Sequence, residues 1–186
     1  MANKLLIVVD MQNDFVTGSL GSKAAQSIVP VVKEKIKEYR SAGHTIIVTK
    51  DTHFDDYPET EEGKHLPAEH CIMNSWGAEI VDELHDVLQP YSEEYKDSNV
   101  ITLNKFTFGC DRLISLLQGR EAAFKEVELI GLCTDICVIA NAVVAKTALP
   151  DAHIIVDASC CAGTSEENHK NALKVMEVLQ IEIRNS

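Results

Sequence analysis

One cysteine in the C-terminal half of the chain stands where a thiol could act as a nucleophile. Cys137 follows the apolar run 127–131 after a short polar stretch, so it should lie in the first turn of a helix that begins just after a strand. Free backbone N–H groups and the helix dipole favour a thiolate at such a position. Thr134 or Asp135 is the expected N-cap of this helix. The alternative that the residues leave open is a buried, inert cysteine.

Several other reactive side chains also follow predicted strands. Asp10 closes the apolar run that begins at Leu5, Asp51 and His53 follow the second such run, and Lys105 follows the third. Because ligands of open parallel sheets bind beyond the carboxyl ends of the strands, these side chains should share one rim. Asp10 could take the thiol proton and return it to a leaving amine, and the ammonium of Lys105 could hold the ion pair. Each residue taken alone could equally be an ordinary polar side chain at the end of a strand.

Asp51 and His53 are also spaced to share a metal ion. Side chains two residues apart in extended backbone point the same way. His70 follows within the segment 51–75, which has two prolines and no clear periodicity and is predicted to be a long loop that forms a pocket wall. This oxygen and nitrogen donor set suits zinc, manganese or iron. A single Asp-x-His pair with one distant histidine is a weak signal, so a loop without a metal ion is the alternative.

The elements that must position these residues alternate along the chain. Short β-branched runs predict buried strands, and apolar residues three and four apart, such as Ile28, Val31 and Val32, predict amphipathic helices. The alternation predicts an α/β fold, a three-layer α/β/α sandwich with a mainly parallel, six-stranded, Rossmann-like sheet. The expected strands are 5–10, 45–50, 100–104, 127–131, 153–157 and 181–184, and the expected helices are 24–42, 76–88, 111–119, 135–148 and 165–179. Thr164 and Glu167 form the expected capping box of the last helix.

Length and charge restrict the kind of protein. A chain of 186 residues can bury one core, and we expect one domain over residues 1–186. The net charge of -12 repels phosphate backbones and anionic lipid surfaces, so neither nucleic acid nor a membrane is an expected partner. The apolar run 5–9 is shorter than a signal-peptide core. We therefore expect a cytoplasmic protein whose six cysteines are reduced. A homo-oligomer that acts on a small molecule is a further expectation, which composition alone does not establish.

Three motifs together resemble those of the isochorismatase-like cysteine hydrolases, the family that includes the nicotinamidases. The motifs are Ile7-Val-Val-Asp10-Met-Gln-Asn-Asp14-Phe15, Asn104-Lys105-Phe-Thr-Phe108 and Gly131-Leu-Cys-Thr-Asp-Ile-Cys137-Val. They occur in the family's order and extend from the first predicted strand to beyond the fourth. The combination is highly specific, although no single motif is.

The resemblance implies a catalytic triad. In it, Asp10 is the general base and acid, Lys105 is its electrostatic partner, and Cys137 is the nucleophile. It also implies a cis peptide between Leu132 and Cys133, which turns the backbone N–H groups of Cys133 and Cys137 toward a developing oxyanion. The sequence does not explain how Lys105 reaches Asp10 from a strand that could be outermost in the sheet.

The loop 51–75 resembles the metal-binding loop of the nicotinamidases. These enzymes bind a divalent metal through an Asp-x-His pair, a later His and a further His or Glu, which implies an ion, zinc before manganese or iron, on three side chains: Asp51, His53 and His70. This chain departs from the usual pattern, because Thr52 replaces a tryptophan and the extra histidine is absent. Glu62, in preference to Glu59, would have to serve as the further ligand, and His65 is expected to be an exposed loop histidine.

The activity implied by the resemblance is hydrolysis of a small planar carboxamide, foremost nicotinamide, with release of ammonia through a thioester on Cys137. The metal would take the pyridine nitrogen, and Phe15 and Phe108 would flank the ring or belong only to the core. One alternative is a metal-free relative that cleaves another small amide, carbamoyl or ureido compound. A second alternative is a non-catalytic module that keeps the fold. Four further side chains are expected to have only packing or surface roles: Cys71, Cys160, Cys161 and His169.

Overall fold

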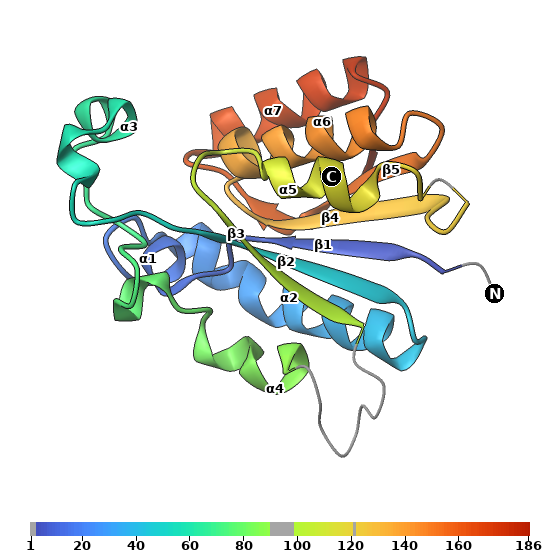
Figure 1. Ribbon diagram of the computed structural model, residues 1–186, viewed down its shortest axis with the longest axis horizontal. Helices are drawn as coiled ribbons and strands as arrows, with labels where there is room; N and C mark the ends of the chain where they lie inside the picture. Colours follow the sequence, from blue (N-terminus) through green and yellow to red (C-terminus); the bar gives the residue numbers. More distant parts are fainter. Residues whose placement is uncertain (1–2, 90–98, 121) are drawn as a thin grey trace.

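The computed structural model describes residues 3–89, 99–120 and 122–186, and a parallel β-sheet forms its centre (Figure 1). Six strands lie in the order β3-β2-β1-β4-β5-β6, and every neighbouring pair is parallel. The strands are β1 (Leu5–Val9), β2 (Thr45–Asp51), β3 (Val100–Lys105), β4 (Glu126–Leu132), β5 (His153–Ala162) and β6 (Glu182–Arg184). The predicted six-stranded, Rossmann-like sheet is confirmed.

Both faces of the sheet are buried, because alternate residues of each strand enter two different cores. In β1, Ile7 and Val9 pack into one core, while Leu6 and Val8 pack into the other. A continuous apolar run is what a parallel strand needs when helices cover both of its sides. The side of Leu6 is covered by α2 (Lys23–Ser41) and α4 (His85–Leu88), and the side of Ile7 by α5 (Asp111–Leu117), α6 (Ile139–Ala148) and α7 (Glu166–Val178) (Figure 1). The expected three-layer sandwich is therefore present.

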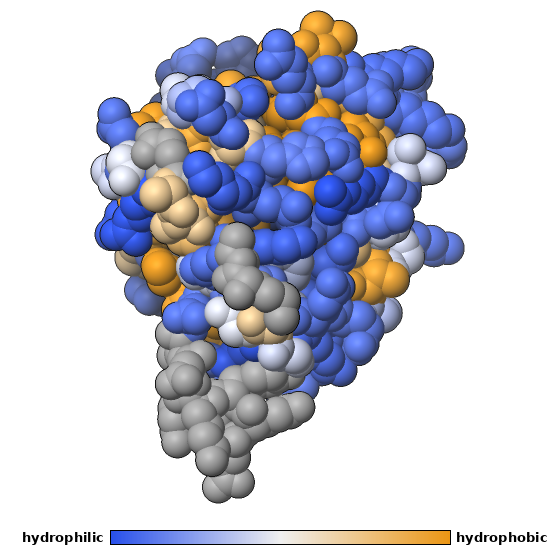
Figure 2. All heavy atoms as spheres, turned by 90° about the vertical axis from the view of Figure 1, so that its right-hand side faces the viewer, coloured by the Kyte–Doolittle hydropathy of each residue, from blue (hydrophilic) through white to orange (hydrophobic). Residues whose placement is uncertain are grey.

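The two ends of the sheet differ in character. The chain starts at the right of Figure 1, so the carboxyl ends of the strands lie at the left, beside α1 (Asn13–Val16) and α3 (Glu61–His65). Figure 2 shows the opposite end, where mainly hydrophilic residues cover the surface and hydrophobic ones show between them. The polar residues that follow the strands are gathered at the end that carries α1 and α3. None of the helices in the described part of the chain has the length and apolar character needed to cross a membrane.

The expected helix 76–88 is wrong, because three short helical pieces replace it. They are the 3-10 turns Trp76–Ala78 and Asp82–Leu84 and the single turn of α4. Between the first two, Ile80 forms an antiparallel bridge with Gln12, and the Val81 N–H donates to the carbonyl of Met11 (3.0 Å). Backbone groups that pair with the chain after β1 cannot also close an α-helical ladder.

Other boundaries also differ from the expectation. The predicted loop 51–75 contains the 3-10 turn Tyr57–Glu59 and the short helix α3. Strand β5 continues past 157, because its end pairs with the last residues of β4 after a register shift. Ser165 caps α7 by accepting from the Asn168 N–H (3.1 Å), so the proposed cap at Thr164 is wrong.

The helix that carries Cys137 begins differently from the prediction as well. A π-helical turn, Thr134–Val138, precedes α6, and its N-cap is Cys133, with no side-chain cap. The Thr134 hydroxyl contacts His169 (2.8 Å), and Asp135 accepts from the N–H of Thr164 (2.8 Å). These two side chains therefore join the turn to the start of α7 and do not cap it.

Candidate active site

Asp10, Lys105 and Cys137 meet in the interior at the carboxyl ends of the strands. The Nζ of Lys105 lies 2.8 Å from the Oδ2 of Asp10 and 3.5 Å from the Sγ of Cys137. Asp10 and Lys105 are fully buried, and Cys137 is 6% exposed. A charged lysine without access to water needs such close partners, because desolvation opposes its charge. The three residues singled out from the sequence are thus brought into contact.

The reach of Lys105 across the sheet has a simple geometric basis. β3 is an edge strand, and β2 separates it from β1, so its Cα lies about 10 Å from that of a residue level with it on β1. A lysine side chain and an aspartate side chain pointing toward each other can cover that span. Lys105 is level with Asp51 in the register of β2 and β3, so the lysine passes over Asp51 on its way to Asp10.

Asp10 is held by its backbone and by Thr49. Its φ of 50° is in the left-handed region, which Asp tolerates better than most residues. Its N–H donates to the carbonyl of Thr49 (3.2 Å), and the Thr49 hydroxyl donates to its Oδ1 (2.7 Å). Next to it, Gly131 in β4 has a φ of 118°, and a Cβ there would lie 2.1 Å from the Val9 carbonyl oxygen. The close approach of β4 to β1 therefore requires glycine.

The buried charges oppose and compensate one another. Burial opposes the charge of Lys105, but Asp10, Cys137 and Asp51 outweigh it, so the pKa of Lys105 is raised and its ammonium persists. Burial raises the pKa of Asp10, and the neighbouring charge of Asp51 adds to the effect against the opposing influence of Lys105. Asp51 behaves differently, because its bonds to His53, His70 and Lys105 outweigh burial and lower its pKa. Asp10 is therefore the carboxylate of this pair that accepts a proton more readily.

The surroundings of the Cys137 thiol oppose its ionisation. Burial raises its pKa well above the usual value, and the charge of Asp10 raises it further. Desolvation of the sulfur therefore works against the thiolate that the start of the helix is expected to favour. The sulfur nevertheless lies between a proton acceptor and an ammonium, so its proton has a short path to Asp10.

Two features of the backbone concern the N–H groups of Cys133 and Cys137. The peptide between Leu132 and Cys133 is cis, as the family resemblance implies. Among the described residues, none accepts a hydrogen bond from the backbone N–H of Cys133. The π-helical turn is closed by the Val138 N–H, which donates to the carbonyl of Cys133 (3.0 Å), five residues earlier. Cys137 precedes Val138, so its own N–H lies in the first turn of the helix. These are donors of the kind that stabilise an oxyanion.

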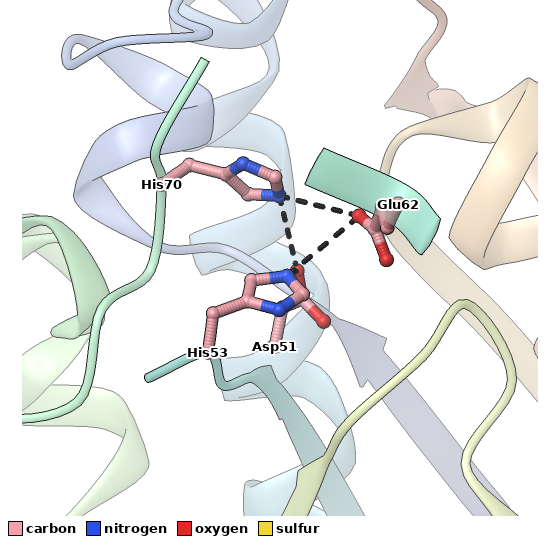
Figure 3. Close-up of side chains that lie close together, drawn as sticks. All are labelled: Asp51, His53, Glu62 and His70. Carbon is pink, nitrogen blue, oxygen red and sulfur yellow. Dashed lines mark hydrogen bonds and ion pairs between the residues drawn. The ribbon is translucent and has the colours of Figure 1, made fainter. Parts of the chain in front are cut away.

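A group of metal-binding side chains lies beside the triad, and Figure 3 shows its members pointing toward one another. One ligand atom from each lies within 4.8 Å of all the others, and the residues are Asp51, His53, Glu62 and His70. The Oδ2 of Asp51 is 3.0 Å from His53 Nε2 and 3.4 Å from His70 Nε2. The Oε1 of Glu62 is 3.7 Å and 3.6 Å from the same two nitrogens. Two imidazoles and two carboxylates converging on one point fit a divalent metal ion.

Contacts with residues outside the metal-binding group fix the orientation of the two histidine ligands. His70 Nδ1 contacts the carbonyl of Ala68 (2.8 Å), which leaves Nε2 to face the group. The buried ring of Tyr57 packs on both histidines, at 4.7 Å from His53 and 5.1 Å from His70 between ring centroids. Such a shell is typical of metal ligands, because it sets the tautomer and the ring plane. Glu62 belongs to this group, whereas Glu59 is exposed and lies outside it, and His65 is exposed as expected.

A cavity of about 360 Å³ joins the metal-binding group to Cys137. Phe15 and Phe108, both proposed as substrate contacts, line it, and so do Glu62 and His70 from the loop that was expected to form a wall. The described residues that line it include no lysine or arginine. A cavity of this size, mostly apolar with a few converging polar groups, is typical of a small-molecule site.

Two residues that position the site were not singled out from the sequence. The side chain of buried Gln12 accepts from the Asp51 N–H (2.7 Å) and donates to the Asp51 carbonyl (2.8 Å). Asn141 donates to the carbonyl of Cys137 (2.8 Å) and accepts from the N–H of Cys110 (2.8 Å). Spacing could have indicated Asn141, because it follows Cys137 by four residues on the same helical face. Gln12 lies within the first motif, but its partner comes from another strand.

The residues expected to have no chemical role are consistent with that expectation in their surroundings. All six cysteines are free thiols. Cys71, Cys160 and Cys161 are buried among apolar side chains, and burial raises the pKa of Cys160 to about 11. His169 is half-buried, and burial lowers its pKa.

Comparison with known proteins gives one consistent result. The family model described as the isochorismatase domain matches residues 4–184. An isochorismatase family protein of Bacillus subtilis is 30% identical over 178 residues, which cover 91% of this chain and 92% of the relative. The structure resembles a pyrazinamidase/nicotinamidase of Streptococcus mutans (30% identity, TM-score 0.81, 97% of this chain and 99% of the other). It also resembles a pyrazinamidase of Pyrococcus horikoshii in complex with zinc (26% identity, TM-score 0.76, 97% and 98% covered).

Proposed function

The chain belongs to the isochorismatase family, and from this premise we propose that it is a cysteine hydrolase that cleaves the amide C–N bond of nicotinamide, giving nicotinate and ammonia. The observation that carries the proposal is that Cys137 and three of the four metal-binding side chains, those of Asp51, Glu62 and His70, line the same cavity. A planar ring anchored at one end of that cavity presents a carboxamide to the sulfur at the other. Relatives with the same fold include a nicotinamidase and a zinc complex of a pyrazinamidase.

In the proposed reaction, Cys137 is the nucleophile and Asp10 moves the protons. Asp10 takes the thiol proton, and the thiolate attacks the carbonyl carbon while the backbone N–H groups of Cys133 and Cys137 bind the resulting oxyanion. Asp10 then gives its proton to the amide nitrogen, the C–N bond breaks, and ammonia leaves a thioester on Cys137. The raised pKa of Asp10 suits both proton transfers. Lys105 compensates the negative charge, whether it is on Asp10 or on the sulfur.

Hydrolysis of the thioester uses the same residues. Asp10 takes a proton from water, the hydroxide attacks the thioester carbon, and the C–S bond breaks to release the carboxylic acid. The proton on Asp10 then returns to the thiolate, so the site regains its initial state. Phe15 and Phe108 are proposed to flank the ring, since both line the cavity.

The metal-binding group has an orienting role in this proposal. Asp51, His53, Glu62 and His70 would hold the ion, which we propose to be zinc, with manganese and iron as alternatives. The ion would supply a Lewis-acidic contact for the pyridine nitrogen and so fix the carboxamide relative to Cys137.

The charges around the cavity favour this substrate over the alternative of a carbamoyl or ureido acid. A substrate with its own carboxylate needs an arginine or lysine to bind it, and the described lining residues include neither. The lining does include the carboxylates of Asp51 and Glu62. These two carboxylates are proposed to hold the ion, so a neutral amide, which needs no cationic side chain, fits this lining better than an acid does.

The test is an ammonia-release assay with three substrates. Nicotinamide is compared with benzamide, which differs only in lacking the ring nitrogen, and with N-carbamoylglycine, which carries a carboxylate. Each is assayed with added Zn²⁺ or Mn²⁺ and after chelation. We expect nicotinamide to be cleaved fastest and to lose its advantage over benzamide after chelation. Faster cleavage of N-carbamoylglycine, unaffected by chelator, would replace the proposal with the metal-free alternative.

A further inference from the structure

The carboxylate of Asp51 belongs to both halves of the site. Its Oδ1 lies 2.8 Å from the Nζ of Lys105, and its Oδ2 faces the imidazoles of His53 and His70. Lys105 in turn contacts Asp10 and the sulfur of Cys137. An unbroken series of contacts therefore runs from the metal-binding group to the nucleophile through one aspartate and one lysine.

The bridge formed by Asp51 and Lys105 has little freedom to move. The backbone of Asp51 is fixed on both sides by the side chain of Gln12, which is itself fully buried. Lys105 is fully buried at the position level with Asp51 in the register of β2 and β3. A change in charge at Asp51 therefore cannot be absorbed by moving the carboxylate into water, and it must alter how strongly Lys105 is held.

We propose that Asp51 is a positioning residue that couples metal occupancy to the reactivity of Cys137. A divalent ion on Oδ2 draws the negative charge of Asp51 toward itself and weakens the attraction between Oδ1 and the ammonium of Lys105. The ammonium then interacts more strongly with Asp10 and with the Cys137 sulfur, which makes the thiolate easier to form. The inference rests on the proposed function of the triad, and it gives the ion an effect on the nucleophile in addition to orienting the substrate.

The experiment measures Cys137 directly and uses no amide substrate. Methyl methanethiosulfonate, a small neutral reagent, transfers a methylthio group to the sulfur and releases methanesulfinate. Its rate at Cys137 is followed by fragmentation mass spectrometry, which separates Cys137 from the neighbouring Cys133. The ion is Mn²⁺, because it prefers oxygen and nitrogen ligands and should not bind the thiol itself. Mn²⁺ occupancy is measured separately by electron paramagnetic resonance.

Three proteins are compared at saturating Mn²⁺ and after chelation. In the wild type, Mn²⁺ should accelerate modification of Cys137 by about threefold or more, which corresponds to roughly half a pKa unit. Lys105→Gln keeps all four ligands but breaks the bridge, so it should bind Mn²⁺ without the acceleration. His70→Gln removes a ligand that does not contact Lys105, so it should need more Mn²⁺ but keep the acceleration once the ion is bound.

Two results would overturn the coupling. One is an unchanged labelling rate in wild-type protein that has bound Mn²⁺, and the other is an equal acceleration in Lys105→Gln, which would indicate a direct field of the ion. If Lys105→Gln does not fold, Asp51→Asn with bound Mn²⁺ takes its place and should also lack the acceleration. The outcome is independent of the proposed substrate: failure to hydrolyse nicotinamide would leave this assay unaffected, and normal hydrolysis without acceleration would refute only the coupling.

Discussion

Replacing Lys105 with methionine should destabilise the fold as well as stop catalysis. The change keeps most of the side-chain volume but leaves two buried carboxylates, Asp10 and Asp51, without their shared ammonium. Removing one partner of a buried ion pair costs about 3–5 kcal/mol. For a chain of this size, each 1 kcal/mol lowers the melting temperature by about 2–4 °C, so Lys105→Met should melt roughly 6–20 °C below the wild type.

The pH dependence of this difference has a definite sign. Without the ammonium, burial and the charge of Asp51 leave Asp10 with a folded-state pKa above the unfolded value of about 3.9. A carboxyl group whose folded pKa is raised loses stability as the pH rises above its unfolded pKa. The gap between wild type and Lys105→Met should therefore be largest near neutral pH and should shrink as the pH falls through about 4.

A second lysine, which is half-buried, provides the control. Lys35 also bridges two carboxylates, at 2.9 Å from Glu128 and 2.9 Å from Asp157, but it does so on the opposite face of the sheet, under α2. Lys35→Met should likewise lower the melting temperature, while the folded protein keeps its activity and Lys105→Met has none. Thermal unfolding followed by circular dichroism in chelator, from pH 4 to 8, gives the comparison. A Lys105→Met protein that melts within 2 °C of the wild type at neutral pH would refute the view that the lysine compensates two buried charges.

The remaining predictions concern individual residues of the site and one buried carboxylate. Cys137→Ala should fold normally and lose turnover of nicotinamide, and residual activity above a tenth of wild type would exclude it as the nucleophile. Asp10→Asn should lower turnover by about two to four decades in steady-state assays, and a loss below tenfold would remove it from the proton transfers. Glu62→Gln should weaken Mn²⁺ binding by about tenfold or more in calorimetric titrations, whereas Glu59→Gln should not; equal effects would contradict the ligand assignment. Burial opposes ionisation of Asp157, but bonds from Ser159, Lys35 and Asn185 outweigh it and lower its pKa. A carboxyl group with a lowered pKa adds stability above its unfolded pKa, and that stability is lost as the pH falls. In a plot of melting temperature against pH, Asp157→Asn should therefore fall less steeply toward acid pH than the wild type, and an unchanged slope would count against this role.

The fold could be predicted from the sequence because its signals are local. The run 5–9, apolar at every position, indicates a strand covered on both faces, and six short runs rich in β-branched residues, separated by amphipathic segments, indicate a parallel sheet. The helix expected over 76–88 failed for a non-local reason, since residues 79–81 pair with the chain after β1. Periodicity describes the faces of a segment, but it cannot show which distant backbone competes for its hydrogen bonds.

The site was predictable in its residue types and less so in its electrostatics. The spacing of Asp51 and His53 indicated a shared ion, and both lie in the metal-binding group with His70 and Glu62. Glu62 was expected in preference to Glu59, and it lies in the group, but spacing alone does not explain the preference, because it depends on how α3 packs against the turn before it. The raised pKa of Cys137 was not predictable for a similar reason, since a position in a helix's first turn says nothing about how completely the sulfur is buried.

The arrangement of reactive groups follows from the order of the strands. From the sheet edge inward, β3 ends with Lys105, β2 ends with Asp51, β1 is followed by Asp10, and β4 leads into the turn that carries Cys137. Side chains alternate between the two faces of a strand, so a slip of one residue between β2 and β3 would turn Lys105 away from both carboxylates. The apolar residues that precede these groups, such as Ile47 and Leu103 in the same core, fix that register. Burial of the core and placement of the charges are therefore one requirement, because the register that buries Leu103 is the register that brings Lys105 to Asp10.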